Sequence, residues 1–355
     1  MALTDLSSAR AVMELHLDWL HSLPGVWGVG IGRSQRQARK AKGETKGGHA
    51  IRVLAHSRPR PDKRTPHFSI PSELPNEDDS LRVSVEVEAI TEGPSLLQYT
   101  GLHRPVQPGW SVGREYWFTG TIGLIVKRAA HTLFPPLRPP AFPALPLPPI
   151  ALPPWIVPHI VWPPFLRQPD SGERFALSNM HVLGGINIGQ VGDPIFQPGP
   201  LDQQPSAATK IGTLADFVPF QPSANDYDCA IARLDNPSNV DPSIPQIGRP
   251  TRTGDATLET EVEKTGRTTG HTVGYVYLKH VSFPITTGVG RGIFFRDMDL
   301  LRIDHWPGDS GSAVCTRIGG AITVVGLLFA GVRYTSFAFA CPIRRIMQRL
   351  GIGLA

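Results

Sequence analysis

Cysteine is scarce in this chain: Cys229, Cys315 and Cys341 are the only three among 355 residues. Extracellular domains commonly depend on several disulfides, so a small, odd number of cysteines argues against a disulfide framework. It predicts a reducing compartment, and we expect a cytoplasmic location. All three cysteines lie in apolar stretches, where a thiol behaves as a small hydrophobic residue, so we expect core positions rather than nucleophiles.

Long apolar runs are also lacking. The first twenty residues are interrupted by Asp5, Arg10, Glu14 and Asp18 and have no apolar centre of the kind found in signal peptides. Outside a tract broken by prolines, no uncharged apolar run reaches the roughly 18 residues that a spanning helix needs. The sequence therefore predicts neither a secretory leader nor a membrane span.

Metal motifs and a strong charge excess are missing too. None of the twelve histidines lies in an H-E-x-x-H motif or beside paired cysteines, so we expect no metal and no other cofactor. The 35 basic and 30 acidic residues give a net charge of +5, which is too mild to predict nucleic-acid binding. Residues 33–64 concentrate eleven Lys and Arg, which we interpret as a solvated loop, with an anionic partner as the alternative.

Proline and glycine are abundant, at 36 each, which favours a loop-rich all-β protein over a helical bundle. Thirteen of the thirty residues in 135–164 are proline, interleaved with apolar side chains. Proline removes amide donors and fixes φ, so this tract should be an extended insertion. Two hypotheses remain for it: packing on the protein itself, or docking on a partner protein, a second protomer or a lipid surface.

Hydrophobic periodicity predicts two units. Residues 5–22 space apolar side chains as an amphipathic helix, and strand-like runs follow at 26–31, 50–55 and 81–90. Together they predict a small α+β domain over residues 1–105.

Residues 106–355 are predicted to be β almost throughout. Residues 120–125 should form the first core strand. Residues 342–350 have the spacing of an amphipathic helix, with proline in the first turn and glycine after the end. Further strands are expected at 194–198, 210–220, 228–234, 273–281, 292–304 and 321–331.

The most informative segment, W-P-G-D-S-G-S at 306–312, places Ser310 in a tight glycine turn. A serine hydroxyl is a poor nucleophile unless a base and an orienting carboxylate accompany it. His181 ends an apolar run in S-N-M-H-V, and Asp228 begins a strand in D-Y-D-C-A-I-A. Asp226 is interpreted as a solvated turn residue. The order His, Asp, Ser differs from the orders found in subtilisin and in α/β-hydrolases.

These motifs resemble those of the trypsin-like serine proteases: S-N-x-H-V at His181, D-x-A-I-A at Asp228 and G-D-S-G-S at Ser310. With K-T-G-R-T-T-G-H-T-V-G at 264–274, the chain more narrowly resembles a bacterial and plant branch that includes the plant narrow-leaf proteases. The resemblance implies a mainly β, chymotrypsin-like double β-barrel with a C-terminal helix, placed after the small α+β domain.

The resemblance also implies roles for individual residues. His181 would be the general base and acid, Asp228 would orient it, and the backbone amides of Gly308 and Ser310 would form the oxyanion hole. The acid before the nucleophile, Asp309, needs a cation that holds the turn in shape. Bacterial relatives use an arginine, so Arg267 is predicted to pair with Asp309; a surface arginine in a glycine turn is the alternative.

A substrate pocket is implied as well. Asp304 lies six residues before Ser310, where trypsin keeps the acid that selects Lys or Arg, and a purely structural acid is the alternative. Phe329, Ala330 and Gly331 lie on the strand expected to contact the substrate backbone.

The sequence thus predicts a cytoplasmic serine endopeptidase that acts on protein or peptide substrates. Three points stay open: cleavage after basic residues, assembly into a homo-oligomer, and a protein partner of the proline-rich segment. The rival hypothesis is a catalytically idle protease-fold scaffold that assembles partners through its N-terminal domain and proline-rich segment. A complete His, Asp, Ser set argues against the rival, because a scaffold has no need of all three groups.

Overall fold

The structure, a computed structural model, describes residues 4–22, 26–34, 48–55, 71–89, 98–115, 118–129, 172–286, 292–332 and 335–355. The predicted proline-rich insertion at 135–164 lies outside these residues, as does most of the basic run at 33–64. The hypotheses on both segments therefore stay predictions.

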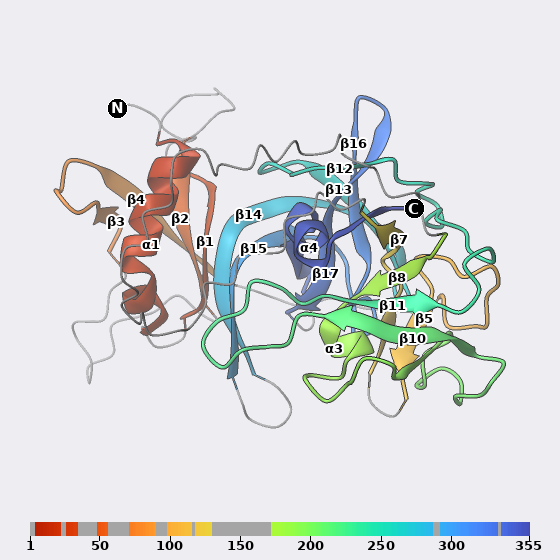
Figure 1. The fold of residues 1–355 in the computed structure, drawn as a ribbon. Helices are drawn as coiled ribbons and strands as arrows, with labels where there is room; N and C mark the ends of the chain where they lie inside the picture. Colours follow the sequence, from red (N-terminus) through yellow and green to blue (C-terminus); the bar gives the residue numbers. More distant parts are fainter. Residues whose placement is uncertain are drawn as a thin grey trace, which may run out of the picture.

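The N-terminal unit is a helix packed against a small sheet (Figure 1). Its elements are α1 (Leu6–Ser22), β1 (Val26–Arg33), β2 (His49–Ala55), β3 (Glu73–Pro75) and β4 (Arg82–Ala89). Asp5 begins the helix, because its carboxylate accepts the amide of Ser8 at 2.8 Å. Helix and sheet share a separate core made of Ala9, Val12, Met13, Leu20, Val29, Ile31, Ile51, Val53, Leu74, Val83 and Val85. The predicted helix and its three strands are present.

The C-terminal half closes into a barrel of antiparallel strands in the order β13–β16–β17–β18–β15–β14, because β14 pairs back with β13. The strands are β13 (Glu261–Gly266), β14 (Gly270–Thr286), β15 (Gly292–Arg302), β16 (Ala313–Ile318), β17 (Ala321–Gly331) and β18 (Phe337–Pro342). The short β12 (Arg252–Thr253) pairs with β17. Phenylalanine rings fill part of the interior, and those of Phe283 and Phe339 stack with centroids 3.6 Å apart.

An eight-stranded sheet in the order β19–β7–β8–β11–β10–β9–β5–β6 forms the other half of residues 106–355, called the protease-like region below. Its strands are β5 (Ser111–Arg114), β6 (Thr119–Thr121), β7 (Leu124–Arg128), β8 (Phe175–Ser178), β9 (Pro194–Phe196), β10 (Lys210–Phe217), β11 (Ala230–Leu234) and β19 (Ile352–Leu354). The last strand follows α4 (Ile343–Leu350), whose end is capped by Gly351 with a left-handed φ of 62°. The predicted double β-barrel with a C-terminal helix is confirmed.

One predicted strand is interrupted. Residues 120–125 were expected to be continuous, but β6 ends at Thr121 and β7 begins at Leu124. Here the chain passes the turn that carries Ser310: a Cβ on Gly123 would lie 2.3 Å from the carbonyl oxygen of Gly311. The close approach of the two halves requires a glycine and breaks the ladder.

The N-terminal unit continues the sheet of the C-terminal barrel. Strand β1 pairs antiparallel with β14, placing Val29 opposite Ser282 and Ile31 opposite Lys279. Figure 1 shows this unit beside the long hairpin of β14 and β15. In the described part of the chain, no helix has the length and apolar character needed to cross a membrane.

Candidate active site

His181 and Asp228 form a hydrogen-bonded pair. His181 lies in the short helix α3 (Met180–Leu183), and pairing of Ala230 with Ser178 brings the segment before β11 beside it. The Nδ1–H of His181 donates to Oδ2 of Asp228 at 2.5 Å, and its backbone amide donates to Oδ1 at 3.2 Å. The Asp228 residue is 2% exposed. Two bonds to one buried carboxylate fix the ring orientation and leave Nε2 as the nitrogen available for proton transfer.

Ser310 lies at the contact between the two halves of the protease-like region. Its carbonyl oxygen accepts the amide of Thr121 at 2.7 Å. A Cβ on Gly120 would meet both that oxygen and a methyl group of Val182, the residue after His181. The Ser310 hydroxyl donates to the carbonyl of Phe329 at 3.2 Å, and the structure gives it no hydrogen bond to His181. The three predicted groups are thus brought to one region, with the hydroxyl turned toward Phe329.

The turn before Ser310 has the backbone shape of an anion-binding loop. Gly308 has φ of 106°, a conformation that favours glycine. A Cβ at this position would lie 2.4 Å from both Nη1 of Arg267 and Oγ1 of Thr268. Among the described residues, neither the Gly308 amide nor the Ser310 amide donates a hydrogen bond. Both predicted oxyanion donors are therefore free to bind a developing negative charge.

Asp309 is held by Lys264, which corrects the predicted Arg267–Asp309 pair. The Nζ of Lys264 lies 3.1 Å from Oδ2 of Asp309, and both side chains are 0% exposed. The same carboxylate accepts hydrogen bonds from the amides of Trp306, Thr268 and Thr269 and from the Thr269 hydroxyl. Burial alone would raise the pKa of Asp309, but the Lys264 charge and these donors hold it below the ordinary value. Asp309 is thus a buried, ionised anchor for the turn.

Arg267 joins the two halves instead. Its Nε donates to Oδ2 of Asp202 at 2.7 Å, and Nη2 forms a second bond with the other carboxylate oxygen. The arginine also donates to the Thr268 hydroxyl, which in turn donates to the Pro307 carbonyl at 2.9 Å. Arg267 therefore supports the oxyanion turn without touching Asp309. The Asp309 carboxylate is already occupied by Lys264 and four hydrogen bonds, whereas Asp202 accepts both arms of the guanidinium group.

A cavity of about 200 Å³ opens beside Ser310. Its lining includes Ala330 and Gly331, as predicted for the substrate strand, together with His305, Trp306 and Leu328. The Phe329 side chain instead packs in the barrel core, 4.8 Å from the Phe295 ring centroid.

The predicted pocket acid lies outside this cavity. Asp304 is exposed and accepts a hydrogen bond from the Ser336 hydroxyl at 2.8 Å. Strand β15 ends at Arg302, and the chain after it turns the Asp304 side chain outward while its carbonyl accepts the Thr272 hydroxyl. The titratable group on the cavity wall is His305, whose pKa is lowered by burial. Among the described residues that line the cavity, none carries a carboxylate to neutralise a basic substrate side chain.

Two residues that support the turn before Ser310 had no role predicted from the sequence. Lys264 pairs with Asp309, and Asp202 pairs with Arg267. The alternation E-V-E-K in β13 puts Lys264 on the same side as buried Val262, and a lysine on an apolar face signals a buried partner. Nothing in the local sequence of Asp202 singles it out. Asp226, interpreted as solvated, instead binds Arg296 at 2.6 Å.

The three cysteines all lie in the protein interior. Cys229, Cys315 and Cys341 are free and buried, as expected, and burial raises the pKa of each thiol. Across the residues with described positions, no group of three His, Cys, Asp or Glu side chains could hold a metal ion.

No protein-family model and no curated protein sequence matches the chain. Solved structures of chymotrypsin-fold serine proteases do match. Protease A of Thermobifida fusca is 15% identical, with 70% of this chain and 98% of that chain covered and a TM-score of 0.43. A Nocardiopsis protease is 14% identical, with 70% and 98% covered and a TM-score of 0.44. A glutamic acid specific serine protease is 15% identical, with 70% and 100% covered and a TM-score of 0.43.

Proposed function

We propose that the protein is a serine endopeptidase in which Ser310 attacks a peptide carbonyl, His181 transfers the proton and Asp228 orients His181. The observation that carries the proposal is the buried His181–Asp228 pair at 2.5 Å, together with a serine turn whose two amides are free. A buried acid that fixes a histidine ring, next to a glycine turn with unused donors, is the arrangement that acyl transfer requires.

In this mechanism the Ser310 hydroxyl first rotates from Phe329 toward Nε2 of His181. As Oγ bonds to the carbonyl carbon, its proton passes to His181, and the substrate oxygen becomes an oxyanion bound by the Gly308 and Ser310 amides. Collapse of this intermediate breaks the C–N bond, and His181 returns the proton to the leaving amine. Water then repeats the sequence on the acyl-enzyme. Catalytic hydrogen bonds are often long or misaligned before substrate binds and form fully only in the substrate complex. The rotation of the Ser310 hydroxyl is therefore compatible with this mechanism.

Lys264 lets the site form without cleavage of a pro-segment. A buried cation is already paired with Asp309 in the intact chain, so no newly formed amino terminus is needed to hold the turn. We therefore propose that the turn before Ser310 takes its active shape without a cleavage that creates a new amino terminus.

The scaffold hypothesis has one observation in its favour, the Ser310 hydroxyl bonded to Phe329 rather than to His181. Labelling with a fluorophosphonate separates the two functions. We expect soluble wild-type protein to be labelled, and labelling to be lost in Ser310→Ala, because only an activated serine reacts at an appreciable rate. Equal signals from wild type and Ser310→Ala would favour the scaffold.

For the residue before the scissile bond, we propose an uncharged side chain. Taking a Lys or Arg charge into a cavity without a carboxylate costs desolvation energy that nothing there returns. In a peptide library we expect cleavage after Lys or Arg to be at least about tenfold less efficient than after an apolar residue that fits the cavity. Asp304→Asn is the matched control and should leave the profile unchanged. A loss of cleavage after basic residues in that variant would restore Asp304 to the pocket.

A further inference from the structure

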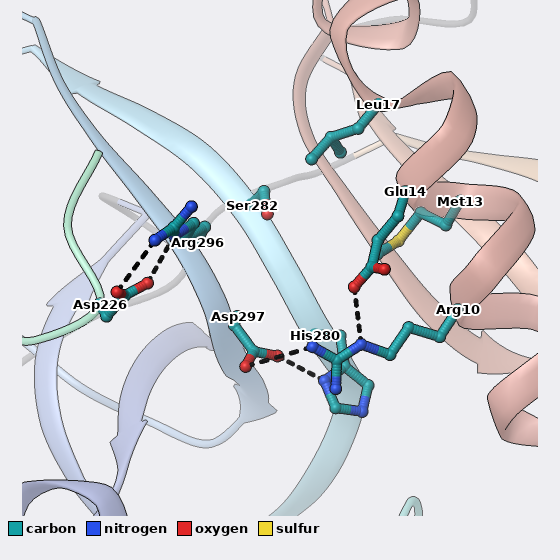
Figure 2. Close-up of a pocket in the computed structure, with 9 residues that line it drawn as sticks. All are labelled: Arg10, Met13, Glu14, Leu17, Asp226, His280, Ser282, Arg296 and Asp297. Carbon is teal, nitrogen blue, oxygen red and sulfur yellow. Dashed lines mark hydrogen bonds and ion pairs between the residues drawn. The ribbon is translucent and has the colours of Figure 1, made fainter. Parts of the chain in front are cut away.

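A cavity of about 350 Å³ lies between the N-terminal helix α1 and strands β14 and β15 of the barrel (Figure 2). Ionisable side chains from both units line it: Arg10, Glu14, Asp226, His280, Arg296 and Asp297. Figure 2 shows Arg10 and Glu14 reaching from the helix toward His280 and Asp297 on the hairpin. The N-terminal unit thus contacts the protease-like region through ionisable groups as well as through the β1–β14 ladder.

Asp297 is the centre of this contact. Its carboxylate lies 2.5 Å from Nδ1 of His280, 3.1 Å from Nη1 of Arg345 on α4 and 3.5 Å from Nη2 of Arg10. Arg10 is steered by Glu14, whose Oε1 accepts its Nε–H at 2.8 Å. Burial raises the pKa of Asp297, but the His280 hydrogen bond and the nearby positive charges outweigh it and lower the pKa to about 2. Asp297 is therefore an anion that binds three separate elements together.

The backbone at this contact is strained. His280 and Asp297 have φ of 56° and 61°, in the left-handed region that residues with a Cβ rarely adopt. His280 lies at the register shift of β14 between Leu278 and Val281, and Asp297 lies opposite the next shift, between Val281 and Phe283. Strained residues of this kind persist only where their surroundings hold them, and they are concentrated at functional positions. The His280–Asp297 pair thus lies at an irregular part of the β14–β15 hairpin, where the two strands face helix α1.

The network continues to the segment that carries the catalytic acid. Arg345 places Nη2 3.7 Å from Oδ1 of Asp226 and its guanidinium carbon 5.3 Å from the centre of the Tyr227 ring. Arg296 holds the same Asp226 carboxylate with two bonds, at 2.6 and 3.1 Å. Asn225 adds two backbone bonds to β15, through Phe294 and Arg296. Residues 225–227, directly before Asp228, are therefore fixed by α4 and β15.

We propose that Arg10 is a positioning residue for the candidate active site. Through Asp297, Arg345 and Asp226, it connects the N-terminal unit to the segment that sets the Asp228 carboxylate against His181. The N-terminal unit thereby contributes to the geometry of the candidate active site. Displacing α1 would make the position of the Asp228 carboxylate less fixed. The kinetic consequence rests on the proposed function, whereas the structural consequence, a weaker His181–Asp228 hydrogen bond, does not.

The test uses the full chain and two variants, Arg10→Met and Asp226→Asn. Mutations along a coupled network change function by about 3- to 30-fold, so each should lower kcat by that factor with KM unchanged, since no substrate contact is lost. In a Ser310→Ala background, the strongly downfield proton NMR signal of the His181–Asp228 hydrogen bond should shift upfield or broaden in both variants. That signal is independent of turnover, so it tests the network even if the chain hydrolyses nothing.

Three controls decide the outcome. Arg10→Lys keeps the charge and should recover most of the loss. Arg344 lies on α4 like Arg345, but it forms an exposed ion pair with Asp255, outside the network. Arg344→Met should therefore change neither kcat nor the downfield NMR signal. The double variant of Arg10 and Asp226 should lose no more kcat than the more impaired of the two single variants, because both residues act through one network. Independent residues would instead multiply their effects on kcat. Multiplied effects, or an unchanged downfield signal in Arg10→Met, would overturn the proposal.

Discussion

Replacing Lys264 by methionine is expected to lower kcat/KM by about 10² or more and to remove serine-dependent labelling. The change leaves Asp309 as a charge 0% exposed and without a cation, which typically costs about 3 to 5 kcal/mol. The protein can relieve that cost by turning Asp309 outward, and this movement rotates the Gly308 and Ser310 amides away from the oxyanion position. Loss of a single oxyanion donor already costs about 10² in rate. Kinetics with a peptide ester, alongside thermal unfolding, measure both effects.

The paired control is the double variant Lys264→Met with Asp309→Asn. The asparagine keeps part of the hydrogen bonding with the backbone of the turn and removes the charge, so activity should recover relative to Lys264→Met alone. Arg267→Met should not be rescued by Asp309→Asn, because Arg267 binds Asp202. Rescue of Arg267→Met instead would contradict the Lys264 assignment.

The titration of Asp309 gives the stability a pH dependence of defined sign at acidic pH. The pKa of Asp309 is held below its ordinary 3.8 in the folded protein, so its stabilisation is fully present above that value. It is lost as the pH falls through the lowered folded pKa. In Lys264→Met the largest cause of the lowering is gone, so the variant should lose stability at a higher pH than wild type does.

Replacing Asp228 by asparagine is expected to lower kcat by about 10⁴, the loss known for the same change in a chymotrypsin-type triad. The carboxylate accepts the Nδ1–H of His181 at 2.5 Å, and an amide can instead present its NH₂ group and favour the wrong tautomer. Such a variant should fold, since asparagine has the same shape. The measurement is kcat referred to titrated active sites.

Asp226→Asn is the matched comparison for that variant, since it makes the same change two residues earlier. Its side chain binds Arg296 rather than His181, so its loss should stay within the 3- to 30-fold range expected for the network. If both asparagine variants lost 10⁴, or if Asp226→Asn were the more impaired, the assignment of the acid to Asp228 would be wrong.

Much of the fold could be predicted because its signals are local. Residues 5–22 became α1 and residues 342–350 became α4, and most predicted strands appear within a few residues. Several strands were not predicted. Among them, β13 carries charged residues on its outer face, and β18 reads F-A-F-A-C-P without polar alternation. The strand at 120–125 was split because Gly123 approaches Gly311, a contact between residues far apart in sequence.

The sequence by itself determined the β-rich class, the two helices and the candidate groups Ser310, His181 and Asp228, because periodicity and short motifs depend on neighbouring residues. The tertiary structure decided which cation reaches Asp309, which residues line the cavity and what Asp226 binds. Those outcomes depend on register and burial between distant strands. Lys264, and not Arg267, pairs with Asp309 because β13 directs the Lys264 side chain into the barrel, where its ammonium group meets the Asp309 carboxylate.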